Sequence, residues 1–183
     1  HCEGHSPNAL ALLDASLRVR DWINLPTEAM GPEQLQSAVF ETALAFNAKA
    51  EAIIGDDLLT QNFPTIHAVG RASHRAPRLL RLDWGDSANP HVGLCGEGVC
   101  FDTGGLDIKA ADGMRNKKKD MGGAAHALVL SRLIMQHKLP IRLTLLIPAV
   151  ENAIAGNAFR PGEVIKTRQG LTVEIDNTDA EGR

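Results

Sequence analysis

The spacing of apolar residues predicts helices over most of the first part of the chain. Residues 6–24 and the stretch after Pro32 carry apolar side chains three and four positions apart, which is the repeat of an amphipathic helix. Proline is favoured in the first turn of a helix, so the second helix is predicted to start at Pro32. Residues 50–54 form a short apolar run typical of a strand, and residues 56–73 predict short helical pieces around Pro64.

The period then changes to two residues, the repeat of a β-strand. Leu80, Leu82 and Trp84 alternate with Arg81 and Asp83. The further predicted elements are strands at 91–95 and 141–147, a helix at 122–137, and a hairpin of 164–166 with 171–176 around Gln169–Gly170. Strands interleaved with helices indicate an α/β layered fold.

The residues that follow the hairpin are polar. Residues 177–183 come directly off a predicted strand, and no covering element follows them. We therefore expect an unfinished sheet and a domain that is truncated on its C-terminal side. The chain also begins at His1 rather than at methionine, which suggests a piece of a longer protein.

Composition narrows the classes of function. The chain of 183 residues is 44% hydrophobic and 22% charged, which supplies enough apolar side chains for a buried core. A net charge of −3 argues against nucleic acid as a partner, because such domains present a basic face. No apolar run approaches the ~18 residues that span a bilayer, so no membrane partner is expected. Three cysteines make no disulfide framework and favour a reducing compartment, the cytoplasm.

Two groups of acidic residues stand out from this background. They are Glu97, Asp102, Asp107, Asp112 and Asp120 around Lys109 in a Gly-rich segment, and Asp176, Asp179 and Glu181 with Arg183 after the hairpin. Carboxylates that converge at strand ends repel one another unless cations lie between them, and hard divalent cations take oxygen ligands. Two-metal hydrolytic sites use such carboxylates. The alternative is a solvated acidic loop whose counter-charges are the lysines of residues 117–119.

Longer motifs add a resemblance to a known family. Residues 101–109 (FDTGGLDIK) and 119–125 (KDMGGAA) resemble the active-site core of the leucine (cytosol) aminopeptidase family, and residues 177–183 (NTDAEGR) resemble its signature heptapeptide. The resemblance implies an α/β fold in which a mixed β-sheet is flanked by helices on both faces. It also implies that residues 1–183 are a single catalytic domain, incomplete at the C-terminus, with the N-terminal regulatory domain largely absent. The connecting parts that resemble the family are residues 19–32 and 151–164.

The resemblance further implies a site with two divalent metal ions, Zn²⁺ or Mn²⁺. Its metal ligands would be Asp102, Asp120, Asp179 and Glu181. Lys109 would face the scissile carbonyl, and Arg183 would hold a bicarbonate ion that relays a proton. Lys117 and Asn177 would belong to the substrate pocket. Two cations lower the pKa of a bound water, and a metal ion together with Lys109 would stabilise the oxyanion that forms on the carbonyl.

Glu97 departs from the family pattern. The family has a lysine at this position, five residues before Asp102, and uses it as a metal ligand. One interpretation is that Glu97 ligates metal itself, which gives a site that prefers Mn²⁺ or Mg²⁺ over Zn²⁺. Another is a damaged site in which the extra carboxylate misplaces the metal. A sequence error or an engineered change is the third.

Lys117 is a second departure, because the family has apolar residues at this point. A lysine in the pocket for the first side chain of a substrate would disfavour Leu or Met and favour an acidic side chain. The alternative is that the long Lys117 side chain turns out to solvent.

These observations lead to one preferred function and two alternatives. The preferred function is a metal-dependent aminopeptidase that removes the N-terminal residue of peptides with a free amino terminus through a two-metal-activated water. The first alternative is a catalytically impaired relative, which acts as a binding or assembly module because Glu97 replaces the lysine ligand. The second is a two-metal hydrolase for another substrate, such as a phosphoester. By resemblance we also expect a homo-oligomer, a hexamer.

Overall fold

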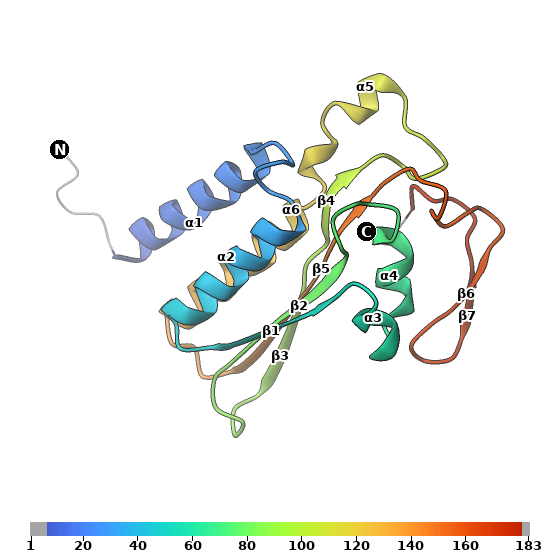
Figure 1. Ribbon diagram of the computed structural model, residues 1–183. Coiled ribbons are helices and arrows are strands. Elements are labelled where there is room, and N and C mark those ends of the chain that lie inside the picture. Colours follow the sequence, from blue (N-terminus) through green and yellow to red (C-terminus); the bar gives the residue numbers. More distant parts are fainter. Residues whose placement is uncertain (1–6, 181–183) are drawn as a thin grey trace.

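The computed structural model describes residues 7–180 and forms a mixed sheet between two layers of helices (Figure 1). In chain order the elements are α1 (Pro7–Asn24), α2 (Pro32–Ala45), β1 (Lys49–Ile54), α3 (Asp57–Thr60), α4 (Pro64–Gly70), β2 (Arg78–Trp84), β3 (His91–Cys95), β4 (Gly98–Asp102), α5 (Ala111–Met114), η1 (Lys117–Lys119), α6 (Gly122–Gln136), β5 (Arg142–Asn152), β6 (Val164–Lys166) and β7 (Thr172–Glu174).

The central sheet is organised around the long strand β5. The order is β1-β2-β5-β3, with β4 also paired to β5. The β1–β2 and β2–β5 pairs are antiparallel, whereas β3 and β4 run parallel to β5 and pair with successive parts of it. The predicted mixed sheet is therefore confirmed. Because β3 and β4 follow one another along the same neighbour, the short link at Gly96–Glu97 is an interruption within one edge of the sheet.

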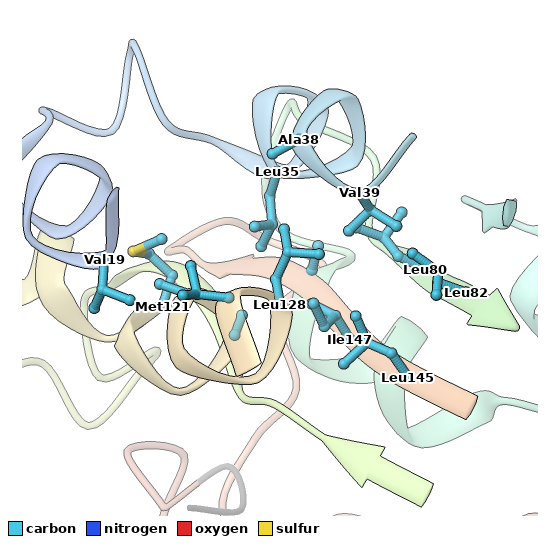
Figure 2. Close-up of a cluster of buried hydrophobic side chains, with 14 of the residues drawn as sticks. Val19, Leu35, Ala38, Val39, Leu80, Leu82, Met121, Leu128, Leu145 and Ile147 are labelled. Carbon is cyan, nitrogen blue, oxygen red and sulfur yellow. The ribbon is translucent and has the colours of Figure 1, made fainter. Parts of the chain in front are cut away.

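The main core lies between this sheet and the helices α1, α2 and α6. Figure 2 shows Leu35 and Val39 of α2 pointing toward Leu128 of α6 and toward Leu145 and Ile147 of β5, and all five are essentially inaccessible to solvent. The sequence produces this packing because alternate residues of β5 point to one face of the sheet. Burial of side chains of this size contributes about 2 kcal/mol each.

The shorter helices α3 and α4 cover the opposite face, beside the β6–β7 hairpin (Figure 1). A Cβ added to Gly70 of α4 would meet the side chains of Pro77 and Val150 at 2.5 and 3.1 Å, so a glycine lets α4 approach the sheet closely. The predicted arrangement of helices on both faces is confirmed. Among residues 7–180 no helix is long and apolar enough to cross a membrane.

Most element predictions are confirmed, with one strand missed and one too short. β4 lies inside the Gly-rich segment, where glycine weakens strand propensity. Gly98 is required there because a Cβ would lie 2.5 Å from the carbonyl oxygen of Pro148 on β5. β5 itself extends to Asn152, beyond the predicted end at residue 147. The two additions matter because Asp102 and Asn152 stand side by side at the ends of β4 and β5.

Candidate functional site

Asp102 is the buried centre of the site. It ends β4, directly after a point where the pairing register with β5 shifts between Val99 and Phe101. Such bulges re-aim side chains next to functional sites. The Asp102 side chain has no exposed surface. Its Oδ1 accepts hydrogen bonds from the Gly104 backbone N–H at 2.9 Å and from Asn152 Nδ2 at 3.0 Å.

The other oxygen of Asp102 faces two ammonium groups. Lys109 Nζ lies 2.9 Å from Asp102 Oδ2, and Lys117 Nζ lies 4.0 Å from the same atom. Burial raises the pKa of the Asp102 carboxyl, but the hydrogen bonds from Lys109 and from the Gly104 N–H together hold this pKa below its ordinary value of 3.8. Asp102 is therefore a carboxylate with one oxygen fixed by neutral donors and one oxygen directed at cations.

A tight loop returns Lys109 to the aspartate that it follows in the chain. The Lys109 N–H donates to the carbonyl of Thr103 at 3.0 Å. Gly104 has φ +89° and Gly105 has φ +65°, a backbone region that residues with a Cβ rarely adopt. The Lys109 side chain is 8% exposed and its ammonium also bonds the carboxylate of Asp179. The loop thus places one cation between two aspartates that are far apart in sequence.

Neutral hydrogen bonds attach the segment that carries Asp179 to this loop. Asn152 Nδ2 donates to the Thr178 carbonyl at 2.9 Å as well as to Asp102. The Thr178 hydroxyl lies 2.6 Å from the Gly104 carbonyl oxygen, and the Thr178 N–H donates to Asp107 Oδ2 at 2.8 Å. Asn152 and Thr178 are both essentially buried. These positioning residues were not among the predicted site residues; the signal for Asn152 is a polar residue that ends a long apolar strand.

Lys117 and Asp120 lie on the other side of Asp102. The 3₁₀ turn η1 places Lys117 Nζ 3.3 and 3.4 Å from the two carboxylate oxygens of Asp120. The Lys117 side chain is 18% exposed, so it points into the site rather than out to solvent. Asp120 follows η1 directly, and α6 begins two residues later, after Met121.

Glu97 occupies the interruption between β3 and β4. Its carbonyl accepts the N–H of Ala124 at 2.7 Å, so the link is held against the first turn of α6. Gly96 permits this contact, because a Cβ there would lie 2.8 Å from the Ala124 Cα. The side chain of Glu97 lines a cavity of about 640 Å³ between the sheet, α4 and the β6–β7 hairpin, and Asn177 lines the same cavity.

Charges of opposite sign alternate across the site. In spatial order they are Asp179, Lys109, Asp102, Lys117 and Asp120. Among residues 7–180 no three His, Cys, Asp or Glu side chains are placed to hold a metal ion by themselves. Lys109 lies between Asp102 and Asp179, and Lys117 contacts both Asp120 and Asp102, whose side chains also interact with each other. The predicted ligands Asp102, Asp120 and Asp179 are thus brought to one site around positive charges. Glu181 and Arg183 lie outside the described residues.

The donor set suits hard divalent cations. All three carboxylates are partly or fully withdrawn from solvent, with side-chain exposures of 0%, 12% and 34% for Asp102, Asp120 and Asp179. Carboxylate oxygens are ligands for Mg²⁺ and Mn²⁺ and also for Zn²⁺. Asp102 Oδ2 faces the ammonium groups of Lys109 and Lys117 at 2.9 and 4.0 Å, and this orientation toward cations makes the residues compatible with bound metal.

Comparison with known proteins shows that the chain is similar to aminopeptidases. The model of the cytosol aminopeptidase family, catalytic domain, matches residues 18–183. Peptidase B of Pectobacterium carotovorum is 42% identical over 174 residues, which cover 90% of this chain and 39% of that protein. The crystal structure of cytosol aminopeptidase from Coxiella burnetii superimposes with a TM-score of 0.95 at 54% identity, covering 98% of this chain and 39% of that one.

A third relative has been solved with bound manganese. The bottromycin maturation enzyme BotP in complex with Mn superimposes with a TM-score of 0.89 at 33% identity, covering 97% of this chain and 40% of that one. The chain thus spans about two fifths of the length of the relatives that it matches.

Proposed function

Because the chain belongs to the cytosol aminopeptidase family, we propose that it provides part of the catalytic centre of a metal-dependent aminopeptidase, which hydrolyses the N-terminal residue of peptides. The observation that carries this proposal is the convergence of Asp102, Asp120 and Asp179 around two cationic side chains. Chance convergence of three withdrawn carboxylates is costly, because like charges in a poorly hydrated site repel one another.

Five acidic residues are proposed as metal ligands. They are Asp102, Asp120, Asp179, Glu181 and Glu97. When bound, two divalent ions would supply Lewis acidity and a water of lowered pKa. An all-oxygen donor set with Glu97 in place of lysine favours Mn²⁺ over Zn²⁺, and the Mn-bound BotP relative supports the same choice.

Lys109 is the proposed electrophilic side chain. Its ammonium is held by Asp102 and Asp179, and its stem is almost completely buried. The two carboxylates fix the direction of the ammonium. A fixed cation beside the scissile carbonyl stabilises the negative charge that develops on the carbonyl oxygen, and losing one such donor costs about 10²–10³ in rate.

The substrate and assembly proposals follow from family membership. Peptides with a free N-terminus would be the substrates, with Lys117 and Asn177 near the first side chain and Arg183 holding bicarbonate. A homohexamer in the cytoplasm is the proposed state. These proposals concern the whole protein, because the relatives are longer than this chain, which covers 39% of Peptidase B.

A catalytically impaired relative is the second candidate, favoured by one specific observation. Lys117 places an ammonium between Asp102 and Asp120, where a cation would have to bind. A protein in which this group never leaves would keep the fold and lose metal-dependent turnover.

One experiment separates the two candidates. The protein is incubated with Mn²⁺ or Zn²⁺ and with matched peptides that have free or acetylated N-termini. The aminopeptidase proposal expects release of the first residue from the free peptide only, with turnover about 10²–10³ lower in Lys109→Met. Equal cleavage of both peptides, or none with two metals bound per chain by elemental analysis, contradicts it.

A further inference from the structure

We propose that the Lys117 ammonium is a built-in counter-ion that competes with a divalent metal ion for the position between Asp102 and Asp120. In the metal-free protein this group neutralises the two carboxylates, and it must withdraw before a metal ion occupies the same position. Lys117 would thereby set how much metal is needed to load the site. This inference rests on the proposed metal-dependent function and concerns its regulation.

The first support is the position of the ammonium. Lys117 Nζ lies 3.3 and 3.4 Å from the two oxygens of Asp120 and 4.0 Å from Asp102 Oδ2. Asp102 Oδ1 is committed to the N–H donors of Gly104 and Asn152, so Oδ2 is the oxygen available to a cation. Lys117 therefore faces the same oxygen of Asp102 as Lys109, at 4.0 Å against 2.9 Å, and lies closer to Asp120.

The second support is the contrast between Lys117 and Lys109. Lys109 makes a 2.9 Å contact with Asp102 and a close contact with Asp179, and its own backbone closes the 103–109 loop. The contacts of Lys117 are longer, and its exposed fraction is 18% against 8% for Lys109. Hydrogen bonds from nitrogen to oxygen usually span about 2.7–3.2 Å, and the Lys117 contacts lie outside this range. Lys117 is thus the more weakly held cation and the one that can leave.

The third support is the local chain. Lys117 projects from a single 3₁₀ turn, between the exposed residues Asn116 and Lys119 and the half-buried Lys118. A lysine stem is long and flexible, and it can carry its ammonium from a site to nearby water. Withdrawal of Lys117 therefore needs rotation of one side chain and no rearrangement of the sheet or of α6.

The charge balance gives the consequence. With Lys117 in place, three aspartates face two ammonium groups, and the site attracts a further cation only weakly. Without it, the same three carboxylates face one ammonium. Two positive charges a few ångströms apart repel one another even in a partly hydrated site, so the metal ion and Lys117 exclude one another. A group that stabilises the metal-free state more than the metal-bound state weakens metal binding by the difference.

The test compares the wild type with Lys117→Met, in the same protein preparation and at one pH. Two quantities are measured: the Tm of the metal-free protein, and the Kd for Mn²⁺ from isothermal titration calorimetry with MnCl₂ alone. The inference expects opposite changes. The metal-free Tm falls, because Asp102 and Asp120 lose a counter-charge, and Mn²⁺ binds about tenfold more tightly, because its competitor is gone.

Three further variants sharpen the test. Lys119→Met removes a lysine from the same turn at an exposed position and is expected to leave both quantities unchanged. Lys117→Arg keeps the charge and is expected to keep the wild-type Kd within about threefold. Lys117→Gln keeps the length of the side chain, and it replaces the Met variant if that protein fails to fold.

The outcomes are distinct from those of the proposed function. A Kd for Mn²⁺ in Lys117→Met that is equal to or weaker than that of the wild type overturns the inference, and weaker binding identifies Lys117 as a ligand. Peptide hydrolysis by the wild type together with an unchanged Kd leaves the function standing and the inference refuted. Tight Mn²⁺ binding by Lys117→Met without peptide hydrolysis leaves the inference standing and refutes the proposed function. Absence of Mn²⁺ binding in both proteins overturns both.

Discussion

Two sides of Asp102 are built differently. On one side, Asn152, Thr178 and Gly104 fix the carboxylate and the 177–180 segment through buried hydrogen bonds of 2.6–3.0 Å. On the other side, Lys117 and Asp120 meet across 3.3–3.4 Å on a single 3₁₀ turn. The bonds of Asn152 and Thr178 on the first side join residues 26 to 74 positions apart, whereas Lys117 and Asp120 on the second side are three positions apart.

The difference shows how one site can be both rigid and adjustable. Neutral donors fix the geometry without contributing charge, and a buried polar network of this kind is costly to break. The ion pair on the η1 side contributes charge without fixed geometry, and pairs of that kind contribute little to stability. The fold therefore positions Asp102 firmly and leaves its cationic neighbour on one side exchangeable.

The largest effect is expected from Asp102→Asn. In the metal-free protein this change leaves the buried Lys109 ammonium without its 2.9 Å partner and is expected to lower the free energy of unfolding by about 4 kcal/mol. Urea denaturation measures it, and Asp112→Asn, at an exposed aspartate of the nearby helix α5, is the matched control. A loss below 1 kcal/mol would show that Asp179 alone compensates the charge of Lys109.

The same variant carries a pH signature. The pKa of Asp102 in the folded protein lies below its ordinary value of 3.8, so its contribution to stability is complete above that value and is lost as the pH falls below it. The slope of unfolding free energy against pH below about 4 is therefore expected to be smaller in Asp102→Asn than in the wild type. Identical slopes contradict the assignment of Asp102 as a carboxylate held charged by Lys109.

The next effect is expected from Asn152→Ala. Two donor contacts disappear from one buried amide, which leaves Asp102 Oδ1 and the Thr178 carbonyl each with one partner fewer. We expect a loss of about 2 kcal/mol in the free energy of unfolding, because buried acceptors that lose a donor are costly. Asn116→Ala, at an exposed position, is the control and is expected to change stability by less than about 0.5 kcal/mol. Equal losses of unfolding free energy in Asn152→Ala and Asn116→Ala would show that the Asn152 side of the site is no more firmly held than the η1 side.

The sequence predicted the scaffold well because its signals are local. The alternation of Leu80, Leu82 and Trp84 is visible in a short window, and so is the helical spacing after Pro32. β4 was missed because Gly98 is required by a neighbour about fifty residues away, the carbonyl of Pro148, and no local pattern records that contact.

The site was predicted unevenly for the same reason. Asp102, Asp120, Asp179 and Lys109 were predicted from motifs, and the structure brings these four together. Their roles as ligands and as an electrophile stay predictions. Asn152 and Thr178 went unrecognised because their function is to join distant segments. Lys117 was predicted to line a substrate pocket, to turn to solvent, or to act with the other lysines of residues 117–119 as a counter-charge of the acidic residues. Its ammonium faces Asp120, a contact that depends on the direction of one flexible stem, and its role in a substrate pocket stays a prediction.

The smallest effect is expected on the adjustable side, and a pair of double-mutant cycles measures it against the other side. In metal-free protein, Lys117→Met with Asp120→Asn is expected to give a coupling energy below about 1 kcal/mol, because the pair is long and partly exposed. Lys109→Met with Asp102→Asn is expected to give more than about 2 kcal/mol, because that pair is buried and shorter. Equal coupling energies would mean that the two ammonium groups are held equally strongly. A metal ion would then not displace Lys117 more easily than Lys109.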